Sequence, residues 1–226
     1  MRSKLLFLSF FISLFAHTQV DNELWLSGGA KYAYTKKLDF YGELNFRLDP
    51  NPVILNSFFT EFSAKYEVAK WFKPSVDYRI ISDRNKFGNY HIGHRFNINA
   101  NLSHDWNRFE FDGRVRLQGT FTRVRSTESS FSDLAPGVRV KTGVLYDINN
   151  SVISPTASCE WFFANDAYDG IYVNKIRASL GIDFEMIGPY NVSLKYMYGQ
   201  SLTKAKSEHI VSFSFTRKYK RKKNKD

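Results

Sequence analysis

The chain has 226 residues, 17% of them aromatic, a single cysteine and a formal net charge of +10 at pH 7. Much of the excess positive charge lies in residues 217–226 and at Arg2 and Lys4, and no nucleic-acid-binding motif accompanies it, so we expect no nucleic-acid partner. The lone cysteine excludes an intrachain disulfide, and Cys159 alternates with apolar neighbours, which favours a packed or lipid-facing thiol.

The N-terminus predicts a cleaved signal peptide over residues 1–18. Arg2 and Lys4 precede an apolar run at 5–16, and small residues stand near a cleavage point after Thr18. This run is shorter than the roughly 20 residues that a transmembrane helix needs. No later segment is longer and as apolar, so any crossing of a membrane must be made by strands.

Behind the signal peptide, apolar and polar residues alternate with a period of two, which is the pattern of β-strands. In the clearest case, residues 175–186, Ile176 and Phe184 lie on one face, and Arg177 and Asp183 lie on the other. In chain order we predict strands at 24–34, 40–48, 58–68, 72–80, 90–102, 109–121, 138–148, 153–163, 175–186, 190–198 and 209–219.

The connections between these strands are expected to alternate in length. Short ones fall at 35–39, 69–71, 104–107, 149–151 and 187–189, and longer polar ones at 49–56, 82–89, 123–137, 165–171 and 200–208. Outer-membrane barrels show this asymmetry and carry an even number of strands. The sequence therefore predicts an all-β fold, a transmembrane up-and-down antiparallel β-barrel of ten to twelve strands with twelve favoured. The barrel is expected to span residues 19–219 as one domain, followed by a basic tail at 220–226.

The polar faces of these strands carry charges of both signs, which we expect to line the lumen. The candidate lumen residues are Arg47, Arg79, Arg95, Glu110, Asp112, Arg114, Arg116, Arg139, Glu160, Arg177, Asp183 and Glu185. Two interpretations stay open. In one, arginine–carboxylate pairs brace a closed lumen, because an unpaired buried charge is costly. In the other, the charges tune the selectivity of a narrow polar pore.

Short segments spread over almost the whole mature chain resemble a known family. They are Trp25 and residues 43–47, 66–71, 77–79, 94–96, 114–118, 158–163, 177–181 and 209–215. In this order they are similar to domain of unknown function 2490, a family of outer-membrane barrels chiefly from Bacteroidota-type bacteria. The resemblance implies an outer-membrane barrel of a Gram-negative cell and brings no activity. Such barrels generally end on an aromatic residue that the assembly machinery reads; here residues 220–226 continue past Tyr219.

We therefore expect an outer-membrane protein with a structural role or a narrow polar pore. Its expected partners are outer-membrane lipid, the barrel-assembly machinery and, for a pore, a small polar solute. No catalytic, cofactor-binding or metal-binding residues are predicted, because no histidine of the mature chain has a serine two residues on and no phosphate-loop or Cys/His spacing occurs. The alternatives are an outer-membrane enzyme acting on lipid or envelope material, and a soluble exported β-barrel that binds an apolar ligand.

Overall fold

The computed structural model describes residues 19–49, 54–85, 87–122, 135–166, 170–186 and 188–220. The predicted signal peptide, 1–18, and residues 221–226 of the predicted tail lie outside these ranges. Within them, no helix is long and apolar enough to cross a membrane.

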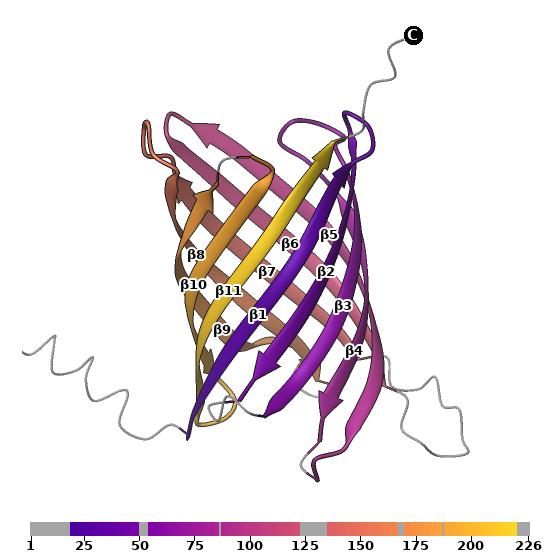
Figure 1. Ribbon diagram of the computed structural model, residues 1–226. Coiled ribbons are helices and arrows are strands. Elements are labelled where there is room, and N and C mark those ends of the chain that lie inside the picture. Colours follow the sequence, from indigo (N-terminus) through magenta and orange to yellow (C-terminus); the bar gives the residue numbers. More distant parts are fainter. Residues whose placement is uncertain are drawn as a thin grey trace, which may run out of the picture.

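The described residues form eleven strands that close into one barrel (Figure 1). Each strand pairs with the strands before and after it in the chain, and β1 pairs with β11 to close the ring. The strands are β1 (Gln19–Ala33), β2 (Leu38–Leu48), β3 (Leu55–Tyr66), β4 (Ser75–Arg84), β5 (Tyr90–Trp106), β6 (Phe109–Thr122), β7 (Ala135–Tyr146), β8 (Ile153–Asp166), β9 (Gly170–Glu185), β10 (Tyr190–Ser201) and β11 (Lys206–Lys220).

The closing pair corrects two expectations. Successive strands are antiparallel, as predicted, but β1 and β11 run parallel, so the barrel is mixed. Eleven strands fall within the predicted ten to twelve, and the preference for twelve is wrong. An odd number of up-and-down strands brings the first and last strands together in the same direction, and both run upward in Figure 1. We call the end where β1 begins the N-terminal end, and the end where β11 finishes the C-terminal end.

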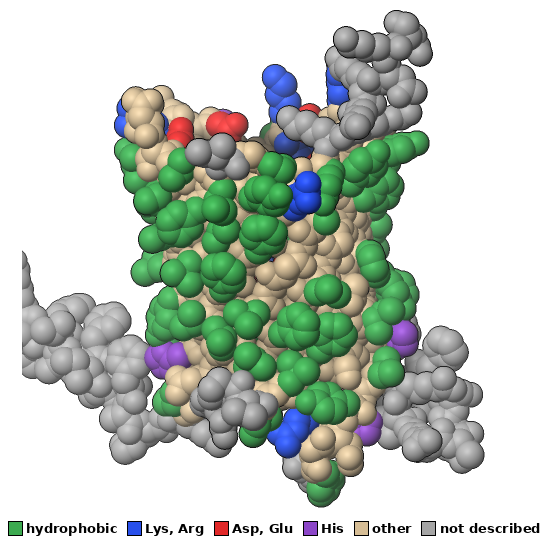
Figure 2. Space-filling view, viewed as in Figure 1, with side chains coloured by type: hydrophobic (Ala, Val, Ile, Leu, Met, Phe, Trp, Pro, Cys, Tyr) green, Lys and Arg blue, Asp and Glu red, His purple; other side chains and the backbone are tan. Residues whose placement is uncertain are grey.

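The two faces of each strand differ in the way that the alternation predicts. On β5, Phe96 is 52% exposed on the outer face, whereas its neighbour Asn97 is 2% exposed on the inner face. Figure 2 shows apolar side chains spread over the visible outer surface. The polar side chains are thus enclosed and the apolar ones exposed, which is the reverse of the arrangement in a water-soluble protein.

Aromatic side chains gather on the outer face near the C-terminal end. Trp71 and Trp106 lie in or beside the connections at this end and are strongly exposed. Tyr32 on β1 lies opposite Tyr219 on β11, at the closing seam. Aromatic rings at the ends of a barrel's apolar band suit the boundary between lipid and water.

Some predicted boundaries move in the structure. The predicted strand 72–80 begins only at Ser75, because Pro74 cannot donate a ladder hydrogen bond; Phe72 instead forms isolated bridges to Ala69 and Leu102. The predicted long connection 165–171 shortens to 167–169, because β8 and β9 both extend towards each other. The alternation of long and short connections is therefore weaker than predicted.

Candidate functional site: an arginine–aromatic belt in the lumen

Contacts between strands that are not neighbours identify the inner face of the barrel. Arg116 on β6 pairs with Asp77 on β4 at 2.9 Å, and Arg114 on β6 pairs with Glu160 on β8 at 2.9 Å. A strand lies between the members of each pair, so the side chains meet over the inner surface. Each belongs to the polar register of its strand.

The structure places all twelve candidate lumen residues in this inward register. They do not form one group. Six arginines come together around the middle of the lumen, with Glu160 and Arg114 beside them. They are Arg47, Arg79, Arg95, Arg116, Arg139 and Arg177. The four at Glu110, Asp112, Asp183 and Glu185 lie near the C-terminal end, and Glu185 is largely exposed at the rim.

The central arginines belong to a ring of side chains that we call the arginine–aromatic belt. Strands β1 to β9 each contribute one member, and four cross-strand pairs set their register. On β10 and β11 the register pair Met197 and Ile210 occupies the remaining arc, with Ile210 fully buried. The belt consists of Trp25, Arg47, Phe59, Arg79, Arg95, Arg116, Arg139, Phe162 and Arg177.

Aromatic rings separate several of the belt's guanidinium groups. The guanidinium carbon of Arg47 lies 4.0 Å from the ring centre of Trp25 and 4.9 Å from that of Phe59. On the other side of Phe59, the same carbon of Arg79 lies 3.8 Å from the ring centre. Phe162 stands between Arg139 at 4.7 Å and Arg177 at 5.1 Å in the same way. Ring faces attract cations, so these aromatics let positive charges gather without a carboxylate for each.

Two belt residues stand beside irregularities in the sheet. The register between β2 and β3 shifts after Arg47, and the register between β8 and β9 shifts after Phe162. A β-bulge bends a strand and changes the direction of the adjacent side chains. The bulges therefore help to aim Arg47 and Phe162 into the belt.

Some of the belt's charge is neutralised by buried ion pairs. Arg79 donates from Nε to Glu61 at 2.8 Å, and these side chains are 10% and 11% exposed. Arg116 donates to Asp77 at 2.9 Å and to the amide oxygen of Asn99 at 2.6 Å. The first pair joins the adjacent strands β3 and β4, and the second joins β4 and β6 over β5. Such charge-assisted hydrogen bonds brace the inner wall.

Three further belt arginines do not contribute to bracing by ion pairs. Among the described residues, Arg47, Arg95 and Arg139 form no ion pair; Arg95 donates only to Thr120, at 3.1 Å. Arg79 lies directly opposite Arg95, and Arg116 lies directly opposite Arg139. Like charges at opposite positions of a sheet are destabilising. The belt therefore holds a concentration of positive charge whose mutual repulsion destabilises the folded barrel.

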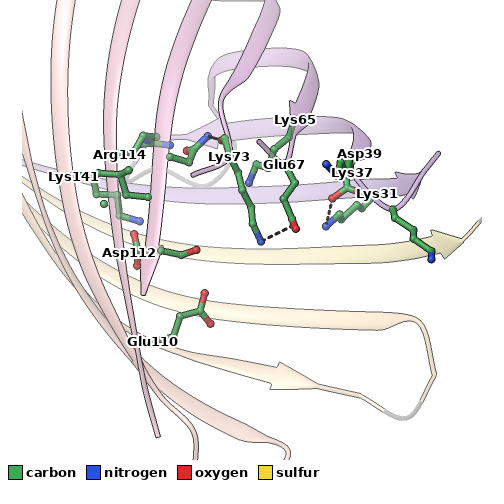
Figure 3. Close-up of a pocket in the computed structure, with 15 residues that line it drawn as sticks. Lys31, Lys37, Asp39, Lys65, Glu67, Lys73, Glu110, Asp112, Arg114 and Lys141 are labelled. Carbon is green, nitrogen blue, oxygen red and sulfur yellow. Dashed lines mark hydrogen bonds and ion pairs between the residues drawn. The ribbon is translucent and has the colours of Figure 1, made fainter. Parts of the chain in front are cut away.

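The lumen is hollow on the C-terminal side of the belt. There it contains a cavity of about 310 Å³ lined mainly by charged side chains, which we call the vestibule (Figure 3). Lys31 pairs with Asp39 at 2.8 Å, and Lys73 with Glu67 at 3.2 Å. A smaller cavity of about 110 Å³ adjoins it. At the belt, by contrast, the inward side chains are buried or half-buried.

The sequence prediction missed the aromatic part of the belt. Trp25, Phe59 and Phe162 occupy the polar, inward register of their strands, and this breach of the alternation was the available signal. No group of His, Cys, Asp and Glu side chains within the described ranges could hold a metal ion. The chemistry of the site is thus hydrogen bonding and positive charge.

Comparisons with known proteins place the chain in a family without an assigned function. The β-domain of the Bordetella autotransporter BrkA is similar at 11% identity and a TM-score of 0.43, over 80% of this chain and 82% of that one. A chain from a structure described as unveiling the mechanism behind the in-meso crystallization of membrane proteins is similar at 12% identity and a TM-score of 0.41, over 79% and 76%. No curated protein matches the chain. The model of the family described as protein of unknown function (DUF2490) matches residues 22–209, and the chain belongs to this family.

Proposed function

We propose that the protein is an outer-membrane β-barrel that forms a narrow, anion-preferring polar pore, with the arginine–aromatic belt as its constriction. The closed barrel has no free sheet edge, and this is what a strand-built membrane protein requires. Its exposed apolar outer face fits outer-membrane lipid as the surrounding solvent.

The observation that carries the proposal is the surplus of arginine at the belt. A barrel braced only for stability would match each inward cation with a carboxylate, because the desolvation of an unpaired charge is costly. Arg47, Arg95 and Arg139 instead lie outside the ion pairs of the described residues. Positively charged side chains that ring a pore favour anions over cations.

A second candidate is a closed barrel with a structural role. The buried pairs Arg79–Glu61 and Arg116–Asp77 favour it, because they tie β3, β4 and β6 together along the inner wall. In the pore, the unpaired belt side chains must move for an ion to pass. We therefore expect a small conductance rather than that of a wide porin.

We also propose that the protein is not an enzyme. His94 and His209 belong to the outward register, where their Nδ1 atoms contact the hydroxyl groups of Tyr78 and Tyr196. Neither histidine has a serine two residues on, so its strand places no hydroxyl nucleophile beside it on the same face. His91 contacts the side-chain amide of Asn85 at 2.7 Å.

Planar-bilayer recording of the refolded full chain tests the pore. In a KCl gradient we expect small single-channel currents with a reversal potential on the anion side. Arg139→Gln removes one unpaired belt charge and should lower the ratio of anion to cation permeability several-fold. Arg217→Gln is the matched control, because Arg217 stacks on Tyr190 and Tyr219 outside the lumen.

Folding is checked by heat-modifiable migration on a gel, since a closed barrel resists detergent until it is boiled. Folded protein without conductance would overturn the pore and leave the braced barrel. Cation selectivity, or equal effects of the two substitutions, would contradict the role of the belt.

A further inference from the structure

We infer that two belt arginines and the residues between them form a specific binding site for a small oxyanion on three neighbouring strands. The site consists of Arg95 and Asn97 on β5, Gln118 on β6, and Gly137 and Arg139 on β7; we call it the Asn97 cradle. Asn97 pairs in register with Gln118, and Gln118 with Gly137, so these three residues form one row of the sheet. Arg95 and Arg139 stand on either side of this row, two residues along their strands.

The first observation is a pair of guanidinium groups without carboxylate partners. Neither Arg95 nor Arg139 forms an ion pair among the described residues, and the two groups repel each other. Glu160, which also acts on Arg139, is already engaged by Arg114 at 2.9 Å and by Arg177 at 4.0 Å. Of the carboxylates that act on Arg95, Glu61 is engaged by Arg79 at 2.8 Å, and Asp83 is exposed and forms no ion pair among the described residues. Two guanidinium groups thus share one free carboxylate, and the local charge stays positive.

The second observation is an unsatisfied polar side chain between them. Asn97 is 2% exposed, and neither its amide nitrogen nor its amide oxygen has a hydrogen-bond partner among the described residues. The side-chain oxygen of Gln118 also lacks one. Buried polar groups are rarely left unpaired, and such a group indicates a bound ion, a bound water or a functional site.

Gly137 leaves space in the row beside these groups. Gly137 has no side chain, and a Cβ atom placed there would lie 3.9 Å from the Cβ atom and 4.0 Å from the amide nitrogen of Gln118. A methyl group would fit there in ordinary contact with Gln118, so the missing side chain leaves an opening of about that size in the row, next to Arg139. This opening faces the same lumen as the guanidinium groups.

The donor set selects the class of anion. A guanidinium presents parallel N–H groups whose spacing matches two oxygens of one oxyanion, and amide N–H groups add further donors. Phosphate, sulfate and carboxylate share this chemistry, whereas a halide is a single atom and cannot present a separate oxygen to each of the two parallel N–H groups. Anion binding at this site does not require the lumen to conduct ions. The binding site and the pore can therefore be tested separately.

Isothermal titration of the refolded chain in detergent with sodium sulfate, at constant ionic strength set by chloride, tests the site. We expect saturable binding with one sulfate per barrel. Arg95→Gln should weaken it roughly tenfold or more, because a charge-assisted hydrogen bond is lost. Lys204→Gln, an exposed change in the connection between β10 and β11, should leave it unchanged.

Gln118→Glu is the decisive variant, because it places a carboxylate of the same size between Arg95 and Arg139. It should abolish sulfate binding and raise the thermal stability of the barrel in sulfate-free buffer. Sulfate binding that survives this substitution, or no binding to folded wild-type protein, would overturn the site. Binding without conductance would overturn the pore alone, and conductance without binding would overturn the site alone.

Discussion

At the scale of single residues, the lumen combines two solutions to the cost of buried charge. Glu61 and Arg79 form a direct pair, whereas Arg47 lies between the rings of Trp25 and Phe59. The first solution neutralises the charge, and the second only lowers its cost, since a cation–π contact leaves the net charge in place. The belt thus remains positive although its acids are paired.

The pair Arg79–Glu61 allows a stability prediction. Glu61→Gln should lower the free energy of unfolding by about 3 kcal/mol, because it leaves Arg79 buried without a counter-charge. The double variant Glu61→Leu, Arg79→Leu should recover most of this loss. Urea unfolding in lipid vesicles measures both, with Glu185→Gln as control, because its partner Lys218 lies 3.8 Å away and both are exposed. A single variant as stable as wild type would refute the bracing role.

At the scale of elements, the strands were largely predictable, because a period of two marks a surface that separates apolar from polar surroundings. The residues at which the strands begin and end were less predictable. The pattern at 72–80 is continuous in sequence, yet Pro74 delays the start of β4. β8 and β9 extend past their predicted ends by pairing with each other, from Phe163 with Val173 to Asp166 with Gly170. This stretch is rich in Asn, Asp and Gly, so its composition predicts a connection rather than a strand.

Two adjacent glycines of β1 test the face assignment. An added Cβ at Gly29 would lie 2.6 Å from the hydroxyl oxygen of Tyr41 and 3.0 Å from the carbonyl oxygen of Gly42, whereas one at Gly28 meets nothing within 4 Å. Gly29→Val should therefore lower the free energy of unfolding by about 1–3 kcal/mol through overpacking. Gly28→Val should be tolerated. Urea midpoints compare the two, and an equal loss would contradict the assignment.

At the scale of the whole molecule, the parallel seam between β1 and β11 decides how the barrel closes. Ser27 and Ser214 are register partners across it. With Cys159→Ser as background, Ser27→Cys and Ser214→Cys together should form a disulfide that changes migration on a non-reducing gel. Ser27→Cys with Ser212→Cys is two residues out of register and should react poorly, because disulfide formation requires Cα atoms within about 7 Å. Equal yields would refute the parallel register.

The sequence by itself determined the strand faces, and with them the inward position of every candidate lumen residue, because alternation along one strand is a local property. It left open whether those charges brace the lumen or tune a pore. Only the tertiary structure brought Arg95 and Arg139 near enough to repel each other and showed that Glu61, Asp77 and Glu160 are engaged by other arginines. It also decided the odd strand number. Register between strands, and the meeting of side chains across a lumen, depend on pairing between residues far apart in the chain, and no local period encodes that.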